Sequence, residues 1–575
     1  MPYFAETHNL GQLIRNSCAH WDEKPAVLNP EKGLYEPISY REYWEKVKSY
    51  AAALQSLGLK RGDKINIFSD NAIEWNITDW AAQCLGIVTV PIYPTLPPDQ
   101  AQFIVENAGT KLIICGSDDL INKVADTGVK TIRLKGVEGS LASIAATATI
   151  SDEAINEEID KNNATDLATI IYTSGTTGVP KGVMLSHDNF LSVVQAVQAT
   201  IPLSHTDIFM SFLPLSHVYE RLCGHFLPFG LGATIAPVQN LASIGNDMLK
   251  VRPTVMCAVP RFLDAMRSKI LDGVTKAPPI RQKLFHAALA QGTAKFVGKS
   301  APLSSVLDKI VGDKIRQKMG GRFRFFVSGG AALPSHVAEF FGAFNILVLQ
   351  GFGLTETSGG TSFNLPTRNN YKTLGEIILG QEWKIEPDGE ICIRGRTVMM
   401  GYYNLPEDTA AAIDKDGWFR TGDIGQFEGV SIRITDRKKD LLVLGNGKNI
   451  APQPIENLIK ESEYISEVCL IGDGMDCVCG LIIPDFDHLK NFATKQGINF
   501  STDEDLINSE PIKALIKAEV AKVNKKLADF EKVKRHVLIN ARFSVETGEL
   551  TPSMKVKRRV VKERFADEIQ SMVKG

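Results

Sequence analysis

Tyr172-Thr-Ser-Gly-Thr-Thr-Gly-Val-Pro-Lys181-Gly182 follows directly after the apolar run Leu167-Ala-Thr-Ile-Ile171. Two of its glycines, Gly175 and Gly178, permit backbone turns that leave N–H groups pointing outward. Hydroxyl donors and one positive charge come from the side chains of Ser174, Thr176, Thr177 and Lys181. An apolar strand that ends in such a loop predicts a phosphate-binding loop on an α/β sheet.

The loop is not a Walker A motif, because that motif ends in Gly-Lys-Ser or Gly-Lys-Thr. Here Pro180 precedes the lysine and Gly182 follows it. A surface loop between a strand and a helix is the alternative that these residues alone leave open.

Segments on both sides of the loop alternate between helical and extended patterns, which is typical of parallel sheets covered by helices. The helices predicted from this pattern are residues 40–57, 73–84, 99–108 and 188–200. The predicted strands are residues 64–68, 88–91 and 111–115. The sequence therefore predicts an α/β fold.

The middle of the chain repeats the scheme, with a strand at 323–328, a helix at 335–344 and a strand at 346–350. Both strands end at glycines. Ligands of open α/β sheets gather at the carboxyl ends of strands. We therefore expect the loops at 172–182, 328–332 and 350–357 to share one crevice.

After about residue 375 the pattern changes to short alternating runs, 389–394 and 430–435, with glycine and aspartate turns between them. This indicates a β-rich subdomain. Five charges in a row follow in Asp436-Arg-Lys-Lys-Asp440, and the rest of the chain returns to an α+β pattern. A domain boundary is predicted at this charged run.

Composition excludes several classes of protein. The 575 residues carry 64 basic and 66 acidic side chains, so the formal charge of -2 gives no reason to expect binding to a nucleic acid polymer. The start, Met1 to His8, lacks the pattern of a signal peptide, and the longest apolar stretch, 226–238, is too short to cross a bilayer. We expect a cytoplasmic protein.

The nine cysteines show no pairing rhythm and are interpreted as reduced thiols. The one close pair, Cys477-Val-Cys479, lies in a strand-like stretch. A metal site there is the less favoured alternative, because no second pair of cysteine or histidine residues stands nearby.

One region departs from neutrality. Residues 261–324 contain 14 basic and four acidic side chains, with Phe, Leu and Ile between the charges. A solvated helical face is the favoured interpretation, and peripheral contact with a membrane surface is the alternative.

Two further motifs have chemistry that suits a nucleotide. In Gln350-Gly-Phe-Gly-Leu-Thr-Glu356, the aromatic ring offers a face for a purine, the threonine a hydroxyl and the glutamate an oxygen ligand for Mg²⁺. Helix capping explains Thr355 and Glu356 equally well. In Gly417-Trp-Phe-Arg-Thr-Gly-Asp423, the aspartate suits the two hydroxyls of a ribose, but a structural turn is the simpler reading.

The order of these motifs, followed by Asp436–Asp440 and a lysine near the carboxyl end, resembles the adenylate-forming (AMP-binding) superfamily, most of all its long-chain fatty acyl-CoA synthetases. The resemblance implies an enzyme that converts a fatty acid and ATP to acyl-AMP and pyrophosphate, and then forms acyl-CoA. Its cofactors would be ATP, Mg²⁺ and coenzyme A. Alternatives are an acyl-carrier-protein synthetase, a fatty acyl-AMP ligase, or a non-catalytic scaffold that binds acyl lipid or nucleotide.

The resemblance also implies roles for individual residues. Phosphate-binding residues would be Thr173, Ser174, Gly175, Thr176, Thr177, Gly178 and Lys181. Adenine would meet Gly329, Gly330, Ala331 and Phe352, and Gly351 and Gly353 would also belong to the ATP site. Asp423, helped by Arg437, would bind the ribose, Thr355 the α-phosphate, and Glu356 with Thr176 the metal.

The same resemblance implies the domain layout: an N-terminal domain at 1–436 with two doubly wound sheets and a β-rich subdomain, a hinge at 437–440 centred on Lys439, and a small mobile α+β domain at 441–575. Lys555 in Thr551-Pro-Ser-Met-Lys555 aligns with the adenylating lysine, and Lys557 is the alternative. With Thr355 and Glu356, it would be catalytic.

The acyl pocket is placed by resemblance at Leu213-Pro-Leu-Ser-His-Val-Tyr-Glu-Arg221. Its lining residues would be His217, Val218, Tyr219 and Arg221. His217 is interpreted as part of the pocket wall, since activation of a carboxylate requires no proton abstraction. The preference for a long chain rests on the resemblance alone.

Overall fold

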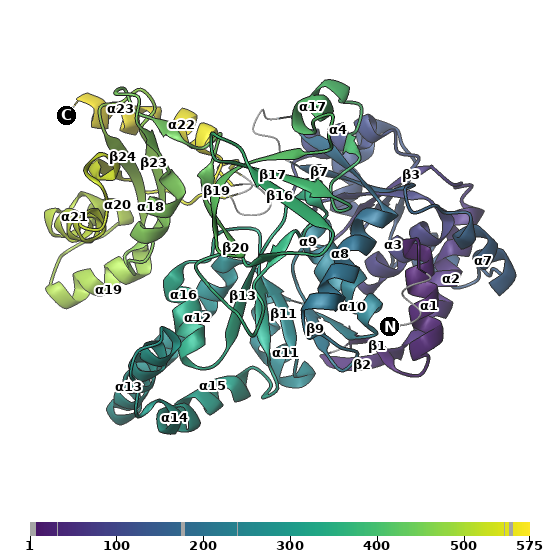
Figure 1. Cartoon of the computed structure of the whole chain (residues 1–575), viewed down its shortest axis with the longest axis horizontal. Coiled ribbons are helices and arrows are strands. Elements are labelled where there is room, and N and C mark those ends of the chain that lie inside the picture. The colour runs from purple at the N-terminus through teal and green to yellow at the C-terminus, as the bar shows by residue number, and fades with distance from the viewer. Residues whose placement is uncertain are drawn as a thin grey trace. The chain divides into compact units, whose positions relative to one another are not determined.

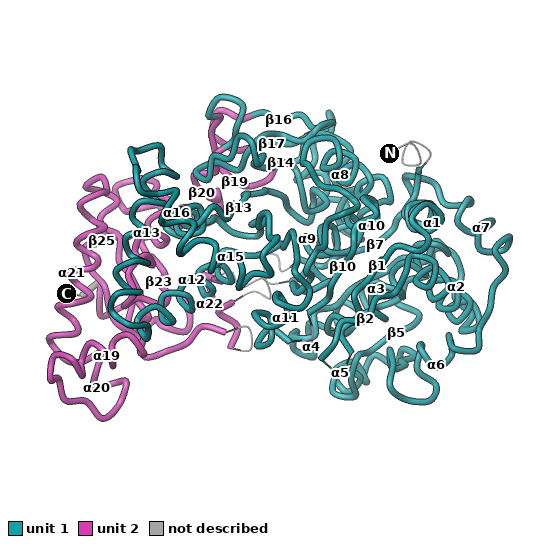
Figure 2. Tube along the Cα trace, turned by 90° about the horizontal axis from the view of Figure 1, so that it is seen from below, with its two compact units in different colours: residues 1–384, 392–420, 428–432 teal, residues 385–391, 421–427, 433–575 magenta. Residues whose placement is uncertain are grey.

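The structure is a computed structural model that describes residues 7–31, 33–173, 179–238, 240–544, 547–550 and 556–574. The chain divides into two compact units (Figure 2). Unit 1 comprises Met1–Lys384, Cys392–Arg420 and Glu428–Ile432, and unit 2 comprises Ile385–Ile391, Thr421–Phe427 and Arg433–Gly575. Ser174–Gly178 and Lys555, which the sequence singled out, lie outside the described residues.

The run before the phosphate loop is a buried strand, β7 (Leu167–Thr173), in a seven-stranded sheet of unit 1 with the order β18-β8-β7-β4-β3-β5-β6. The five adjacent strands β7, β4, β3, β5 and β6 run parallel, and β6 forms the edge of the sheet. The bounds of the other strands are β3 Lys64–Phe68, β4 Val88–Ile92, β5 Leu112–Cys115, β6 Thr131–Arg133, β8 Lys181–Ser186 and β18 Gly401–Tyr402. The predicted α/β class is confirmed.

Strand β8 was not predicted. It runs antiparallel to β7, with Thr173 paired with Lys181 and Tyr172 with Gly182. The loop therefore joins two neighbouring antiparallel strands, and the predicted helix begins only after β8, as α8 (His187–Thr200). The Ser186 side chain accepts the backbone N–H of Asn189 at the start of α8, and the Asn189 side-chain oxygen accepts the backbone N–H of Ser186.

The helices that cover this sheet lie close to their predicted positions: α2 Tyr40–Ser56, α3 Ile73–Leu85 and α4 Pro98–Ala108 (Figure 1). A capping box between Ser39 and Glu42 starts α2. Gly86 ends α3 in the left-handed region at φ 66°, where glycine is favoured. Large side chains such as Trp80 fill the space beneath them.

A second sheet of unit 1 has five adjacent parallel strands in the order β10-β9-β11-β12-β13. Their bounds are β9 Ile208–Ser211, β10 Thr234–Pro237, β11 Val255–Ala258, β12 Phe325–Ser328 and β13 Leu347–Phe352. Strand β1 (Pro25–Glu31) extends it in parallel beside β10, followed by antiparallel β2 (Leu34–Ser39). Since β12 and β13 are neighbours, the loops that follow them lie side by side.

The basic stretch forms helices that gather at one end of unit 1, at the bottom of Figure 1. They are α12 Pro260–Thr275, α13 Pro279–Phe296, α14 Ser304–Leu307, a π-helical turn Asp308–Gly312 and α15 Asp313–Lys318. Helix α13 packs closely on α16 (Ser335–Ala343), because a Cβ at Gly292 would lie 2.1 Å from the carbonyl oxygen of Ala343.

Strands follow residue 375, as predicted: β15 Glu376–Ile377, β16 Gln381–Ile385, β17 Glu390–Gly395, β19 Phe419–Glu428 and β20 Ser431–Arg437. One short strand, β14 (Ser362–Phe363), precedes them. Strands β16, β17, β19 and β20 contribute residues to both units (Figure 2).

Unit 2 contains a three-stranded sheet of β23 (Ile465–Ile471), β24 (Val478–Pro484) and β25 (Val533–Leu538). Its helices are α18 Pro452–Ile459, α19 Phe486–Gln496, α20 Asp503–Asn508, α21 Glu510–Asn524, α22 Arg558–Arg564 and α23 Ala566–Lys574. This mixed arrangement agrees with the predicted α+β character of the C-terminal part.

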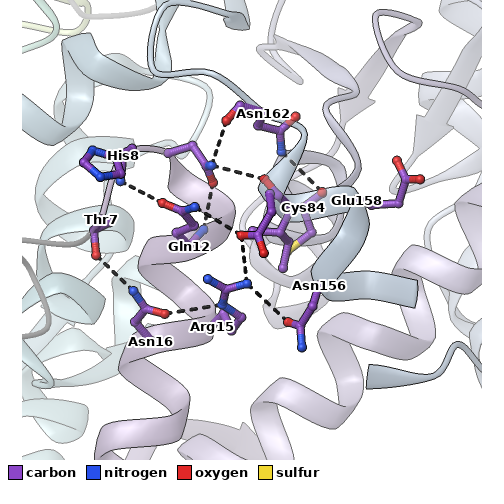
Figure 3. A network of polar contacts seen from close by, with 12 residues as sticks. Thr7, His8, Gln12, Arg15, Asn16, Cys84, Asn156, Glu158 and Asn162 are labelled. Carbon is purple, nitrogen blue, oxygen red and sulfur yellow. Dashed lines mark hydrogen bonds and ion pairs between the residues drawn. The ribbon is translucent and has the colours of Figure 1, made fainter. Parts of the chain in front are cut away.

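A polar network anchors the first helix, α1 (Leu10–Trp21), to α3 and α7 (Asp152–Asp160) (Figure 3). The amide of Asn9 donates to the carbonyl oxygens of Ile159 and Asn162, and the Asn162 amide donates to those of Gln83 and Cys84. These contacts fasten the start of α1 to α7 and, through Asn162, to α3.

All nine cysteines are free thiols and all are buried. Among the described residues, no helix combines the length and the apolar character that a membrane span requires.

Candidate functional site

The two ends of the phosphate loop are held next to each other. Thr173 and Lys181 face one another across the β7–β8 ladder. Lys181 then turns its ammonium group to two partners from one later segment: it forms an ion pair with Asp408 of α17 (Pro406–Ala412), and its Nζ lies 5.2 Å from the ring centroid of Tyr402.

Glu356 lies in the short turn Thr355–Thr357, and the same Tyr402 reaches it. The Tyr402 hydroxyl donates to Glu356 Oε1 at 2.9 Å. Burial, followed by the negative charge of Glu356, raises the pKa of the Tyr402 phenol, so the hydroxyl keeps its proton. The predicted cation and the predicted carboxylate are therefore brought together around one tyrosine.

Sequence reasoning missed Tyr402 and Asp408. They lie in Met399-Met-Gly-Tyr-Tyr-Asn-Leu-Pro-Glu-Asp408, where a glycine, two tyrosines and an acidic helix start offer a weak signal. The deciding contact is the pairing of β18 with β8, Tyr402 opposite Val183, which no local pattern reveals.

On the second sheet, the predicted adenine residues lie at the ends of β12 and β13. Gly329 leaves little room for a side chain, because a Cβ there would lie 3.0 Å from the Tyr219 ring. The Tyr219 hydroxyl donates to the carbonyl oxygen of Val327 at 2.8 Å. Gly330, at φ 82°, and Ala331 are exposed beyond this contact.

The next loop is equally constrained. A Cβ at Gly351 would lie 2.8 Å from the Phe363 ring, and one at Gly353 would lie 2.4 Å from the backbone of Gly359. The partly exposed Phe352 ring packs edge-on against Trp383, with centroids 5.8 Å apart. A flat apolar surface therefore borders the glycine turns.

The predicted acyl residues begin at a helix start. The Nδ1 of His217 accepts the backbone N–H of Tyr219 at 3.1 Å, which caps α9 (Val218–Arg221). His217 is partly exposed, whereas Val218 and Tyr219 are buried. Through Tyr219, this segment reaches the predicted adenine residue Gly329.

Arg221 lies fully buried in the core of unit 1. Its Nε donates to Asp79 Oδ2 at 2.9 Å, and its terminal nitrogens also reach the hydroxyls of Thr89 and Thr169. Burial alone would raise the pKa of Asp79, but the Arg221 charge and a hydrogen bond with His225 hold it well below its ordinary value. The guanidinium thus has a full set of core partners.

The neighbouring Glu220 is buried as well. Burial raises the pKa of this carboxyl to about 8, against the opposing hydrogen bonds from the Ser211 hydroxyl and the backbone of Phe212. The sequence reading did not mark this group.

In unit 2, the predicted ribose pair is formed: Arg437 Nε donates to Asp423 Oδ1 at 3.0 Å. Asp423 is buried and follows Gly422, whose φ is 71°, within β19. Lys439, the predicted hinge residue, is exposed in the turn after β20.

Leu550 and Val556, the described residues on either side of the predicted adenylating motif, form an isolated β-bridge. Lys557 donates its backbone N–H to the Glu549 carbonyl oxygen at 2.7 Å. Arg558 is held by Glu456, with Nη1 to Oε1 at 2.7 Å.

Among the described residues, no group of three or more His, Cys, Asp or Glu side chains is placed to hold a metal ion. Mg²⁺ in nucleotide sites commonly uses one or two carboxylates together with the substrate phosphates. Glu356, a carboxylate that shares the Tyr402 side chain with Lys181, suits that mode.

A model of the AMP-binding enzyme family matches residues 14–403, and a model of the AMP-binding enzyme C-terminal domain matches residues 439–575. The chain belongs to the AMP-binding enzyme family. The first match contains Lys181, Glu356 and Tyr402, and the second begins at Lys439.

Relatives of this AMP-binding enzyme span nearly its whole length. Long chain acyl-CoA synthetase 6, peroxisomal, of Arabidopsis thaliana is 32% identical, over 94% of this chain and 82% of its own. Long-chain-fatty-acid–CoA ligase 5 of Mus musculus is 30% identical, over 99% of this chain and 89% of its own.

Solved structures share the fold. A fatty acyl CoA synthetase of Mycobacterium tuberculosis aligns with a TM-score of 0.65 at 23% identity, covering 97% of this chain and 98% of its own. The adenylation domain of a carboxylate reductase from Mycobacterium chelonae aligns with a TM-score of 0.75 at 22% identity, covering 99% and 91%. At such identities the likeness concerns the fold alone.

Proposed function

We propose that this AMP-binding enzyme activates a long-chain fatty acid with ATP, giving acyl-AMP and pyrophosphate, and then transfers the acyl group to coenzyme A. The names of its full-length relatives support the substrates. The observation that carries the chemistry is the convergence of Lys181, Tyr402 and Glu356, which sets a cation and a carboxylate on either side of one tyrosine.

Activation is necessary because a carboxylate is a poor electrophile, whereas the carbonyl of a mixed anhydride is open to attack by a thiol. Negative charge builds on the α-phosphate and on the departing pyrophosphate during the first step. Lys181 and the N–H groups and hydroxyls of residues 173–178 bind the phosphates, and Thr355 contacts the α-phosphate. Lys555 adds a second cation for the transition state.

Mg²⁺, held by Glu356 with Thr176, supplies charge neutralisation on the phosphates. The adenine lies by Gly329, Gly330, Ala331 and the face of Phe352, beside Gly351 and Gly353. Asp423, held by Arg437, accepts hydrogen bonds from the ribose hydroxyls. The Asp423–Arg437 contact and the limited room at Gly329 support these roles.

The acyl chain enters beside His217, Val218 and Tyr219, with Arg221 supporting that wall from the core. Tyr219 packs against Gly329, and this contact supports adjacent acyl and nucleotide sites. Each buried methylene is worth about 0.8 kcal/mol, so the depth of the pocket decides the preferred chain length.

The half-reactions test the proposal. Pyrophosphate release by the wild type should depend on added fatty acid, measured across acids of about two to twenty carbons. Lys555→Ala should lose ~10²- to 10³-fold in this step, the usual effect of removing one transition-state donor, while thioester formation from supplied acyl-AMP survives. Lys439→Pro, by stiffening the hinge, should do the reverse.

Lys557→Ala is the matched control, since it removes a neighbouring lysine and should retain pyrophosphate release. Loss in Lys557→Ala alone would move the adenylating role to that residue. Transfer to an acyl-carrier protein instead of coenzyme A would identify the acceptor as the carrier protein. A wild type that releases no pyrophosphate with any acid would favour the non-catalytic scaffold.

We also propose that residues 261–324 contact a membrane surface peripherally. Three apolar side chains at helical spacing are exposed in and around α14. They are Leu303 (58% exposed), Val306 (60%) and Ile310 (42%). Exposed lysines at 299, 309 and 314 flank this stripe. Three of the four acidic residues are engaged in ion pairs, Asp264 with Arg267 and Asp308 and Asp313 with Arg316, which leaves the surface basic. The cytoplasmic location stays a prediction from the sequence.

A further inference from the structure

The segment that carries Tyr402 is fastened to three separate elements of unit 1. The Asn189 side chain of α8 donates to the carbonyl oxygens of Arg396 and Val398, at 2.7 and 3.0 Å. Met400 donates its backbone N–H to the Met184 carbonyl of β8, at 3.0 Å.

The third attachment is to the Glu356 turn. Met399 donates its backbone N–H to the Glu356 carbonyl at 2.8 Å, and the Ser358 hydroxyl donates to the Thr397 carbonyl at 2.8 Å. The backbone on which Tyr402 stands is therefore anchored both to the strand of Lys181 and to the turn of Glu356.

We propose that Tyr402 is a positioning residue that holds Lys181 and Glu356 as one preassembled unit for the magnesium complex of ATP. Its ring stabilises the Lys181 ammonium by a cation–π contact, and its hydroxyl fixes one Glu356 oxygen. The other Glu356 oxygen then faces the ligand in a set orientation. This inference rests on the proposed function, because it deepens the role of the same site.

Asp408 completes the arrangement. It pairs with Lys181, and the two side chains are 39% and 25% exposed, so a phosphate can take the place of the aspartate. During that exchange the Tyr402 ring keeps Lys181 in position. Asp408 therefore pairs with Lys181 until a phosphate replaces it, whereas Tyr402 contacts Lys181 both before and after ATP binds.

The two contacts of Tyr402 come from different parts of its side chain and are separable by substitution. Tyr402→Phe keeps the ring under Lys181 and removes the hydrogen bond to Glu356. Tyr402→Leu removes both. Tyr403→Phe is the matched control, because the neighbouring Tyr403 ring lies over Lys64, 5.4 Å from its Nζ.

The test is calorimetric titration of the full chain with ATP, in EDTA and in Mg²⁺. Tyr402→Phe should bind metal-free ATP like the wild type, while the tightening of binding by Mg²⁺ falls about threefold or more, the scale of one lost hydrogen bond. Tyr402→Leu should also weaken metal-free binding about two- to fivefold, the scale of an exposed cation–π contact. Tyr403→Phe should match the wild type in both.

A Tyr402→Phe protein that keeps the full tightening by Mg²⁺ overturns the inference. A merely structural role would lower the melting temperature of both Tyr402 variants and leave the response to Mg²⁺ unchanged, which also overturns it. If the wild type binds the magnesium complex of ATP but releases no pyrophosphate with any acid, the proposed function fails while this inference is decided by the titration. A wild type that does not bind ATP overturns both.

Discussion

The adjacent side chains of Glu220 and Arg221 are both buried, but they have different kinds of partner. Arg221 forms a buried ion pair with Asp79 in the core. Glu220 has neutral partners, a serine hydroxyl and a backbone group, and the pKa of its carboxyl is raised to about 8. At neutral pH the first is an ion pair and the second is largely an uncharged acid, so the Glu220 carboxyl is the one of these two groups that couples folding to pH in the neutral range.

The pH dependence of stability follows from the Glu220 carboxyl. In the unfolded chain it ionises near its ordinary pKa of 4.5, whereas in the folded protein it holds its proton up to about pH 8. Between these values the folded state binds more protons, so its contribution to the free energy of unfolding falls as pH rises, by on the order of a few kcal/mol.

Glu220→Gln should remove this component. Urea unfolding of the variant at pH 5 to 8, about the window set by the two pKa values, should show a flatter profile than the wild type, with the gain in stability greatest near pH 8. Profiles of equal slope would contradict the assignment.

At the scale of elements, the Arg221 cluster fastens α9 to α3 and to two strands of the first sheet. Arg221 belongs to α9, Asp79 to α3, Thr89 to β4 and Thr169 to β7. Four elements that are far apart in the sequence thus meet at one guanidinium group. Removal of the guanidinium group leaves the buried Asp79 carboxylate without its ion-pair partner.

Arg221→Met should lower the free energy of unfolding by ~3–5 kcal/mol, the effect of breaking a buried pair from one side. Denaturant unfolding measures it. Asp79→Asn combined with Arg221→Met should be more stable than Arg221→Met alone, because the unpaired Asp79 charge is gone.

Arg41→Met, which breaks the exposed pair with Asp22, is the control and should change stability by about 0–1 kcal/mol. A stable Arg221→Met enzyme with a raised KM for fatty acid would place Arg221 in the pocket itself.

Elements with a clear hydrophobic period were predictable. Lys64–Phe68 was predicted as a strand and is β3. Four of its five residues are buried, as expected for an inner strand. Strand β8 was missed, since Lys181 and Gly182 read as the end of a loop. Tyr402 and Asp408 were missed for a different reason: their partner Lys181 lies more than two hundred residues earlier, and only the β18–β8 pairing joins them.

At the scale of the whole molecule, the two units carry different parts of the predicted site. Lys181, Glu356 and Tyr402 belong to unit 1, whereas Asp423, Arg437 and Lys439 belong to unit 2. The large surface of unit 1 also carries the stripe of Leu303, Val306 and Ile310.

The membrane proposal predicts binding to lipid vesicles that contain phosphatidylserine, weakened by salt, since basic side chains near an anionic surface each contribute about 1 kcal/mol. A variant with Leu303, Val306 and Ile310 all changed to serine should bind at least about tenfold more weakly, because it loses the apolar contact. Cosedimentation measures both effects.

The control carries serine at Leu34 and Leu379, which are 62% and 63% exposed outside the basic stretch. It should bind like the wild type. Equal loss in both variants would show that the stripe has no special role, and a wild type that stays in the supernatant would refute the membrane contact.

Because all nine cysteines are buried, the rate at which their thiols are labelled reports how often the structure opens. A thiol reacts as the thiolate, so an alkylating reagent modifies this protein only where the structure has transiently come apart. Six of the thiols belong to unit 1, and Cys469, Cys477 and Cys479 belong to unit 2. The masses of labelled peptides over time therefore report the rate of opening of each unit separately. ATP will slow the labelling of cysteines in the unit to which it binds.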